Sequence, residues 1–210
     1  MNIAEAIVFV VDDDASIRRA MQRLLHTEGL TVETFASAWE FLRREPPTGP
    51  ACLVLDVHMP EVNGLTLQEL LAGAEHLMPI VFLTGYGTVP RSVQAMKAGA
   101  SDFLQKPCDD KVLLEAIYRA LHRAQRAWHD YIEQSTLHER LESLTPREHE
   151  VLACVVTGML NKQIADALGV SEKTVKVHRG RIMQKMNAMS LVELVRMADK
   201  VGVRPPCHIA

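Results

Sequence analysis

The sequence predicts an open α/β domain with a parallel sheet, followed by a small all-α domain. Five short apolar runs alternate with helical patterns through the first part of the chain, which is typical of a parallel sheet covered by helices on both faces. The last third of the chain shows helical patterns alone. A length of 210 residues suits two domains of this kind.

Charge divides the chain in the same way. Residues 1–143 hold 13 Lys and Arg against 20 Asp and Glu, a net charge of −7, whereas residues 144–210 hold 10 against 6, a net charge of +4. We therefore expect the two parts to bind different partners, and the basic part is a candidate for binding a polyanion.

The composition favours a cytoplasmic protein with no membrane partner. No apolar stretch approaches the roughly 20 residues that a membrane helix needs, and the first residues lack the features of a signal peptide. The four cysteines are widely spaced, so we expect reduced, mostly structural thiols instead of disulfides or a zinc site.

Strands are expected where apolar runs are bounded by turn residues. Ile7 to Val11 is continuously apolar, as in a buried strand of a parallel sheet, whereas Thr31 to Phe35 alternates. The five expected strands are Ile7–Val11, Thr31–Phe35, Leu53–Leu55, Ile80–Leu83 and Asp102–Gln105.

Helices are expected where apolar residues recur at spacings of three and four. Ile17, Met21 and Leu24 give the first helix its apolar face, with Ser16 or Asp14 as its cap. The other expected helices of this domain are Ala38–Leu42, Thr66 to about Ala74, Val93–Ala98, and one that starts near Asp109 and Asp110.

Polar side chains follow four of these strands. In the flavodoxin-like strand order 2-1-3-4-5, the first and third strands are neighbours, and the carboxyl ends of all strands meet at one edge. Three carboxylates, one hydroxyl and one ammonium therefore converge there, from Asp12, Asp13, Asp56, Thr84 and Lys106.

This set of groups is suited to phosphoryl chemistry. Clustered carboxylates attract a hard cation such as Mg²⁺, which keeps water ligands for a substrate phosphate. A carboxylate can attack phosphorus and form an acyl phosphate, while the metal and a lysine neutralise charge on the transferred group. The alternative is a structural acidic cluster neutralised by Lys106.

The motifs in this part of the chain resemble the receiver domain of bacterial two-component response regulators. The resemblance covers roughly residues 5–123 and rests on Val10-Val11-Asp12-Asp13-Asp14, Leu55-Asp56-Val57-His58-Met59-Pro60-Glu61-Val62-Asn63-Gly64, Thr84-Gly85 and Lys106-Pro107. It implies a CheY-like fold and a phosphorylation site.

The resemblance also implies a role for each site residue. Asp56 would accept phosphate from a sensor histidine kinase, and Thr84 and Lys106 would bind the phosphoryl oxygens. Mg²⁺ would be held by Asp13, Asp56 and the backbone carbonyl of His58, with Asp12 acting through water. Phe103 would be the aromatic switch residue, together with Thr84.

Residues 109–144 form one long helical pattern. Leu114, Ile117, Leu121, Ala124, Trp128 and Tyr131 recur with a period of 3.5, which indicates either a coiled-coil seam or the last receiver helix packing on its sheet. We favour a helical linker over residues 121–143, between a receiver at 1–120 and a second domain at 144–210.

The second domain has the pattern of a helix-turn-helix. Thr145, Pro146 and Glu148 make a capping box for its first helix. Asn161 to Leu168 predicts a second helix, Gly169 a tight turn, and Ser171 the cap of a basic third helix.

Its motifs resemble the LuxR-type DNA-binding domain over about residues 142–203. They are Leu144-Thr145-Pro146-Arg147-Glu148-His149-Glu150-Val151-Leu152, Asn161-Lys162-Gln163-Ile164-Ala165 and Val170-Ser171-Glu172-Lys173-Thr174-Val175-Lys176-Val177-His178. With both halves, the chain is similar to the NarL/FixJ response regulators, nearest the FixJ, StyR and TodT group.

This second resemblance implies double-stranded promoter DNA as a partner, read by Lys176 and Val177. Gly180 stands where the NarL protein has a base-contacting lysine, which Arg179 or Arg181 would have to replace. The expected DNA-binding residues are Lys173, Thr174, Lys176, Val177, His178, Arg179, Arg181 and Lys185. The final helix carries an apolar stripe that serves dimerisation in relatives or packs in the core.

We therefore expect a phosphorylation-controlled transcription factor, an activator that meets RNA polymerase. Phosphorylation would promote a homodimer through the face from Val89 to Asp102. One alternative is a hydrolase of the haloacid dehalogenase type, but the second residue after Asp56 is His58 and not the Asp that this class uses. The other is a regulator that works without phosphate.

Overall fold

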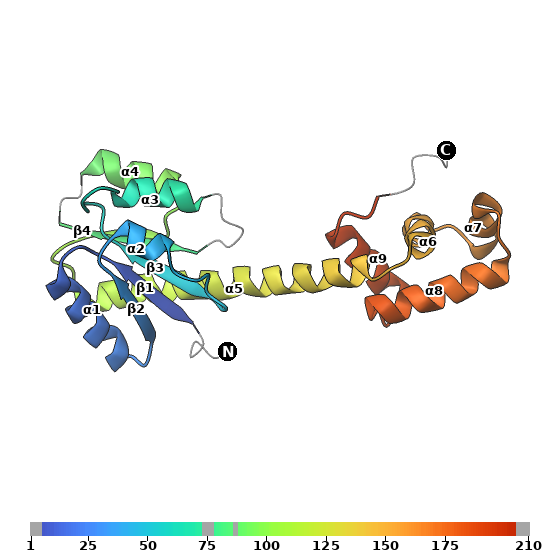
Figure 1. Ribbon diagram of the computed structural model, residues 1–210, viewed down its shortest axis with the longest axis horizontal. Helices are drawn as coiled ribbons and strands as arrows, with labels where there is room; N and C mark the ends of the chain where they lie inside the picture. Colours follow the sequence, from blue (N-terminus) through green and yellow to red (C-terminus); the bar gives the residue numbers. More distant parts are fainter. Residues whose placement is uncertain (1–5, 73–77, 86–87, 205–210) are drawn as a thin grey trace. The chain divides into compact units, whose positions relative to one another are not determined.

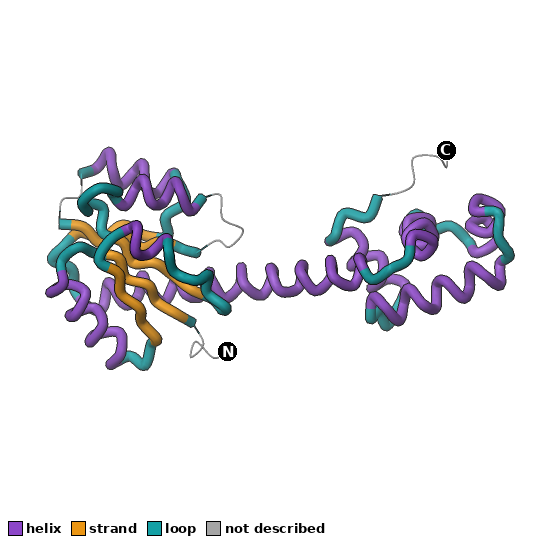
Figure 2. Tube along the Cα trace, viewed as in Figure 1, coloured by secondary structure: helices purple, strands orange, loops and turns teal. Residues whose placement is uncertain are grey.

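The computed structural model of the chain describes residues 6–72, 78–85 and 88–204 (Figure 1). It divides into two compact units, with the division between Asp130 and Tyr131. The first unit alternates strands and helices, and the second is built of helices (Figure 2).

The first unit holds the five strands that the sequence predicts. Its elements are β1 (Ile7–Val11), α1 (Ala15–Thr27), β2 (Thr31–Phe35), α2 (Ala38–Leu42), β3 (Ala51–Leu55), α3 (Gly64–Leu71), β4 (Ile80–Thr84), α4 (Val89–Lys97), β5 (Asp102–Gln105) and α5 (Asp110–Glu142), which continues into the second unit.

All strand pairs are parallel, and the strand order is β2-β1-β3-β4-β5. Helices cover both faces of this sheet (Figure 1). One face packs against α1 and α5 through Met21, Leu25, Ile117 and Leu121. The other packs against α2, α3 and α4 through Phe41, Leu67 and Ala95. The expected doubly covered sheet is therefore confirmed.

Two helices differ in length from the prediction. α3 begins at Gly64, before the expected Thr66, because Asn63 takes the cap position and accepts a hydrogen bond from the Thr66 amide. It ends at Leu71, and its expected end at Ala74 lies outside the described residues. α4 begins at Val89 and not at Val93, with a proline in its first turn, where proline costs no helical hydrogen bond.

α5 confirms the single long helical pattern. Ile117, Leu121 and Ala124 are buried, and the first two pack against the sheet. This half of the seam is thus explained by receiver packing, whereas Trp128 and Tyr131 are half-buried. A dimerising coiled coil stays a prediction.

The second unit contains the C-terminal part of α5 with α6 (Pro146–Val156), α7 (Asn161–Leu168), α8 (Glu172–Met186) and α9 (Leu191–Lys200). The predicted capping box is present: the Thr145 hydroxyl accepts from the Glu148 amide, and the Glu148 carboxylate accepts from the Thr145 amide. The core is made by apolar side chains of α6, α7, α8 and α9, including Val151, Leu152, Ile164, Val175, Ile182 and Leu194.

The turn between α7 and α8 depends on Gly169. Its φ of 65° lies in the left-handed region, which costs an L residue with a Cβ roughly 1–2 kcal/mol. Ser171 then caps α8 by accepting from the Thr174 amide. Both features agree with the predicted helix-turn-helix.

None of the helices in the described ranges combines the length and the apolar character that crossing a membrane requires. Cys52 and Cys154 are buried and Cys108 is partly buried, and all three are free thiols. Burial raises the pKa of the Cys52 thiol, which keeps it protonated and inert. Cys207 lies outside the described residues.

Candidate functional site

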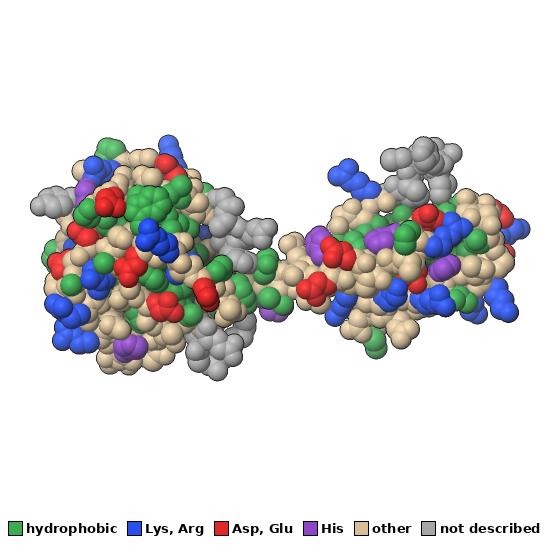
Figure 3. Space-filling model, in the orientation of Figure 1, with side chains coloured by type: hydrophobic (Ala, Val, Ile, Leu, Met, Phe, Trp, Pro, Cys, Tyr) green, Lys and Arg blue, Asp and Glu red, His purple; other side chains and the backbone are tan. Residues whose placement is uncertain are grey.

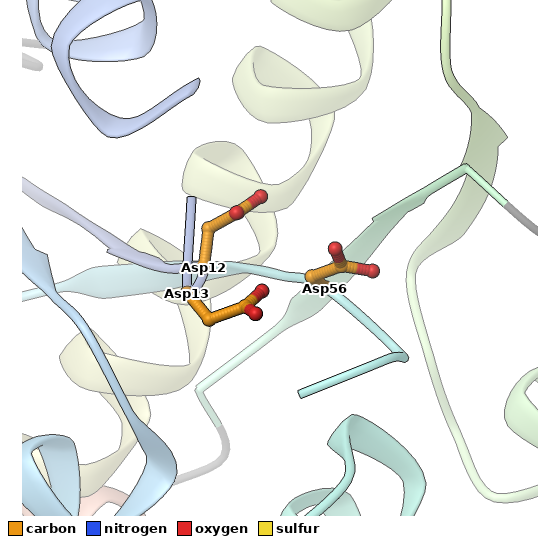
Figure 4. A group of neighbouring side chains, drawn as sticks. All are labelled: Asp12, Asp13 and Asp56. Atoms are coloured by element: carbon orange, nitrogen blue, oxygen red, sulfur yellow. The ribbon is translucent and has the colours of Figure 1, made fainter. Parts of the chain in front are cut away.

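The carboxylates of Asp12, Asp13 and Asp56 form one cluster at the carboxyl edge of the sheet (Figure 4). β1 and β3 pair with Val11 opposite Leu55, so the residues that follow these two strands are neighbours. One ligand atom from each carboxylate lies within 4.8 Å of the others. Asp12 and Asp56 are buried, whereas Asp13 is exposed.

Lys106 brings its ammonium into the cluster from the end of β5. Nζ donates to Asp12 Oδ2 at 2.6 Å and to Asp56 Oδ2 at 2.9 Å. Burial lowers the pKa of Lys106, but the hydrogen bonds with both carboxylates raise it more, so the net pKa is raised. Burial also raises the pKa of Asp12, against the opposing effect of Lys106.

Thr84 ends β4 beside these groups and is fully buried. Its hydroxyl oxygen lies 3.2 Å from Nδ1 of His58. The other ring nitrogen of His58 contacts a guanidinium nitrogen of Arg91, from α4. The backbone amide of His58 donates to Asp56 Oδ1 at 3.1 Å, so His58 contacts the Asp56 carboxylate through its backbone and Thr84 through its side chain.

Gly64 allows α3 to begin directly against the end of β3. A Cβ at this position would lie 2.3 Å from the carbonyl oxygen of Asp56 and 3.1 Å from the Cα of Val57. The Gly64 amide donates to the Val57 carbonyl at 2.9 Å. The atoms that a Cβ would meet belong to the backbone of Asp56 and Val57. A residue larger than glycine would therefore displace the segment that carries Asp56.

The cluster fits a hard divalent cation. Its donors are carboxylate oxygens, which Mg²⁺ prefers, and the exposed Asp13 leaves one side open to solvent. A cavity of about 520 Å³ lies on that side, lined by Asp13, His58, Asn63 and Arg91 among others.

Four contacts in this region were missed by the sequence reasoning. Arg18 on α1 donates to the carbonyl oxygens of Asp12 and Asp13 at 2.7 and 3.0 Å. The contacts of the His58 side chain with Thr84 and Arg91 were also missed. The two His58 contacts join segments far apart in sequence, whereas Arg18 reaches carbonyls of the nearby residues Asp12 and Asp13. No spacing or composition signal points to either.

Phe103, the expected switch residue, is half-buried on β5. Its ring centroid lies 5.8 Å from that of Phe82 on β4. On α4, Val89, Val93 and Met96 are exposed large apolar side chains, within the face that we expect to dimerise.

In the second unit, α8 carries a row of basic side chains (Figure 3). Lys173, Lys176 and Arg181 are exposed, and Val177 is 47% exposed among them. Of the other expected DNA contacts, four are half-buried: Thr174, His178, Arg179 and Lys185.

Two of these half-buried cations already have partners. Arg179 donates to Asn161 Oδ1 at 2.9 Å, which fixes the start of α7 against α8. Lys185 donates to Glu148 Oε2 at 2.7 Å and to the Ser143 carbonyl at 2.8 Å. The Lys185 contacts indicate a structural role that the sequence reasoning did not foresee, although an ammonium has three N–H donors.

Each of the two units matches a protein family of its own. Residues 8–118 match the response regulator receiver domain, and residues 142–198 match the luxR family of bacterial regulatory proteins.

Individual proteins resemble the chain over nearly its whole length. Nodulation protein W of Bradyrhizobium diazoefficiens is 45% identical over 199 residues, which cover 95% of this chain and 88% of that protein. Transcriptional regulatory protein FixJ of Azorhizobium caulinodans is 44% identical, with 94% of each chain covered. Among solved structures, response regulator StyR has a TM-score of 0.84 at 46% identity, covering 93% of this chain and 98% of that one.

Proposed function

The chain belongs to the FixJ-type bacterial two-component response regulators, which regulate transcription, and on this premise we propose that Asp56 is its phosphoryl acceptor. Asp56 is the buried carboxylate at the end of β3, with Lys106 donating to one of its oxygens. A carboxylate oxygen of Asp56 attacks phosphorus, and the bond from phosphorus to the donor's histidine nitrogen breaks.

The neighbouring groups then have distinct tasks. Lys106 stabilises charge on the phosphoryl oxygens, and Thr84 donates its hydroxyl hydrogen to one of them. Asp12, Asp13, Asp56 and the His58 carbonyl would hold Mg²⁺, which neutralises charge on the transferred group. The imidazole of a sensor histidine kinase departs with the electron pair of the broken bond and is protonated.

A small phosphodonor tests this assignment without the kinase. Full-length protein with Mg²⁺ and acetyl phosphate should gain one phosphoryl group, located on Asp56 by mass spectrometry. Asp56→Asn should abolish the gain and EDTA should suppress it, whereas Asp130→Asn, which alters an exposed carboxylate on α5, should change nothing. A label on another residue, or an undiminished label in Asp56→Asn, would refute the proposal.

Phosphorylation would act on α4 through Thr84. We propose that the phosphoryl group draws the Thr84 hydroxyl, that Phe103 moves inward, and that the apolar face with Val89, Val93 and Met96 then pairs with a second copy. The phosphorylated protein should sediment as a dimer at concentrations where the free form is monomeric. Thr84→Ala should accept phosphate and stay monomeric; an equal mass before and after phosphorylation would remove dimerisation as the switch.

The proposed output is binding of α8 to promoter DNA, at paired half-sites and with RNA polymerase as the final partner. The basic row on α8 supports this, since phosphate contacts supply most of the affinity for DNA. For this function the chain would divide into a receiver domain at residues 1–120, a helical linker at 121–143 and a DNA-binding domain at 144–210. A regulator that meets both kinase and promoter acts in the cytoplasm.

Family membership also decides between the alternatives from the sequence. A receiver domain joined to a luxR-family domain identifies a transcription regulator and not a turnover enzyme, so the hydrolase reading is dropped. The acetyl phosphate experiment tests the other alternative, a regulator that works without phosphate.

A further inference from the structure

A second cavity lies at the opposite edge of the sheet from Asp56. It has a volume of about 410 Å³ and is bounded by the segment after α2, by α3, by the start of β4 and by the end of α4. Most of its lining is apolar, with Pro46, Pro47, Leu71, Met78 and Ile80 contributing. Because Ile80 opens β4 and Thr84 closes it, this cavity is separate from the phosphorylation site.

Arg44 is the one cation among the described residues that line this cavity. Its guanidinium carbon lies 4.1 Å from the ring centroid of Phe41 and 4.6 Å from that of Phe9, so both rings hold it in place. A terminal nitrogen lies 3.9 Å from the sulfur of Met78, which places the guanidinium at the cavity wall.

The polar atoms of Arg44 are poorly satisfied. Its Nε is buried without a hydrogen-bond partner, and a thioether sulfur is a weak acceptor. Among the ion pairs formed by described residues, none includes Arg44. Burial lowers the pKa of Arg44, with Glu33 opposing this at longer range, but an arginine stays charged in proteins. Because no described anion forms an ion pair with this partly buried guanidinium, an anion bound within hydrogen-bonding range would stabilise it.

We propose that this cavity binds a small monocarboxylate with an apolar body, its carboxylate on the Arg44 guanidinium and its body against Leu71, Met78 and Ile80. The volume lies in the range of about 300–1,000 Å³ typical of small-molecule sites, and a cavity of about 150 Å³ already holds benzene. A neutral hydrocarbon would leave the guanidinium unpaired. A phosphate ester would find one cation and an apolar wall, with few of the donors that it requires.

A molecule bound here would also touch α4. Ala98 and Gly99, at the end of that helix, line the cavity. The Gln68 amide donates to the Ala95 carbonyl at 3.1 Å and ties α3 to the same helix. The ligand therefore meets the helix that carries the exposed apolar residues of the proposed dimer face.

Titration of ¹⁵N-labelled full-length protein with 2-naphthoate tests the site, with 2-naphthylmethanol as the neutral probe of matched shape. We expect saturable shifts in the amide signals of Leu71, Ile80 and Gly99, and at least tenfold weaker binding of the alcohol. Arg44→Met should weaken naphthoate binding at least tenfold. Arg43→Met, which changes the exposed neighbour outside the cavity, should bind as the unaltered protein does.

The comparison of the two probes needs no substitution and so stands even if Arg44→Met fails to fold. Equal affinity for naphthoate and the alcohol would refute recognition of a carboxylate. An absence of saturable shifts, or shifts confined to other parts of the protein, would refute the site itself.

Discussion

The Nδ1 nitrogen of His58 lies 3.2 Å from the hydroxyl oxygen of Thr84, so the loop after β3 contacts the end of β4. Arg91 on α4 contacts the other ring nitrogen. If Arg91 donates to Nε2, the ring proton is on Nδ1, which donates to Thr84. One imidazole thus connects α4 to the hydroxyl that we propose responds to phosphate.

His58→Ala should favour the phosphorylated conformation. The contact with His58 stabilises Thr84 where it lies now, and it would be given up when Thr84 turns to the phosphoryl group. A hydrogen bond of this kind contributes about 0.5–1.5 kcal/mol. Its loss in both protomers should therefore tighten the dimer of the phosphorylated protein about 5- to 150-fold. Analytical ultracentrifugation at matched phosphorylation measures this change.

His26→Ala, which removes an exposed imidazole at the end of α1, is the control and should leave the dimer constant unchanged. A weaker dimer in His58→Ala would mean that His58 supports the phosphorylated state instead.

Gly64→Ala should destabilise the first unit and impair phosphorylation together. The added Cβ would lie 2.3 Å from the Asp56 carbonyl oxygen, and overpacking of this kind costs about 1–3 kcal/mol. Both tryptophans, Trp39 and Trp128, belong to the first unit, so urea unfolding followed by tryptophan fluorescence reports it. Gly85→Ala, where a Cβ meets nothing within 4 Å, should keep the midpoint; an unshifted midpoint in Gly64→Ala would contradict the argument.

The contrast between these glycines shows what the sequence can and cannot predict. Strands and caps follow from local patterns, so β1, β2, β5 and the Thr145 capping box agree with the prediction. The convergence of Asp13, Asp56 and Lys106 follows from topology, because every parallel strand ends at the same edge. The crowding at Gly64 and the contact of His58 with Thr84 depend on distances between separate segments, which spacing does not encode.

The second unit should lose stability in acid through Glu148. Hydrogen bonds from Lys185 and from the Thr145 amide lower the pKa of Glu148 from 4.5 to about 2. A carboxyl group whose pKa is lower in the folded state stabilises fully above its unfolded pKa. The contribution of Glu148 to the free energy of unfolding should therefore be complete above about pH 4.5 and decrease as the pH drops towards 2. Urea unfolding followed by the NMR signals of α6 and α8 measures this decrease.

Glu148→Gln should remove this pH dependence and lower stability at neutral pH, because Lys185 then loses its carboxylate partner and a neutral amide oxygen is a weaker acceptor for an ammonium. Glu150→Gln changes an exposed carboxylate of the same helix and should retain the acid transition. If Glu148→Gln kept the same slope between pH 4.5 and 2, another carboxyl group would be responsible.

On α8 the basic residues should divide into two roles. Lys176 and Val177 lie near the N-terminal part of the helix, which enters the major groove in helix-turn-helix proteins. A lysine contact to guanine discriminates by about 1–3 kcal/mol, and the exposed Val177 suits a thymine methyl group. Lys176→Ala should therefore lower the ratio of cognate to scrambled affinity about 5- to 150-fold.

Lys173→Ala and Arg181→Ala should instead weaken binding to all duplexes alike, because phosphate contacts position the protein without reading sequence. Each lost phosphate contact should reduce the slope of log affinity against log salt by about one unit. Two half-sites about 10 base pairs apart, centre to centre, are expected for a dimer. Titrations of the three variants against cognate and scrambled duplexes at several salt concentrations separate the roles. If Lys176→Ala kept the affinity ratio and lost only salt slope, Lys176 would be a phosphate contact, and base reading would have to come from Val177 and Arg179.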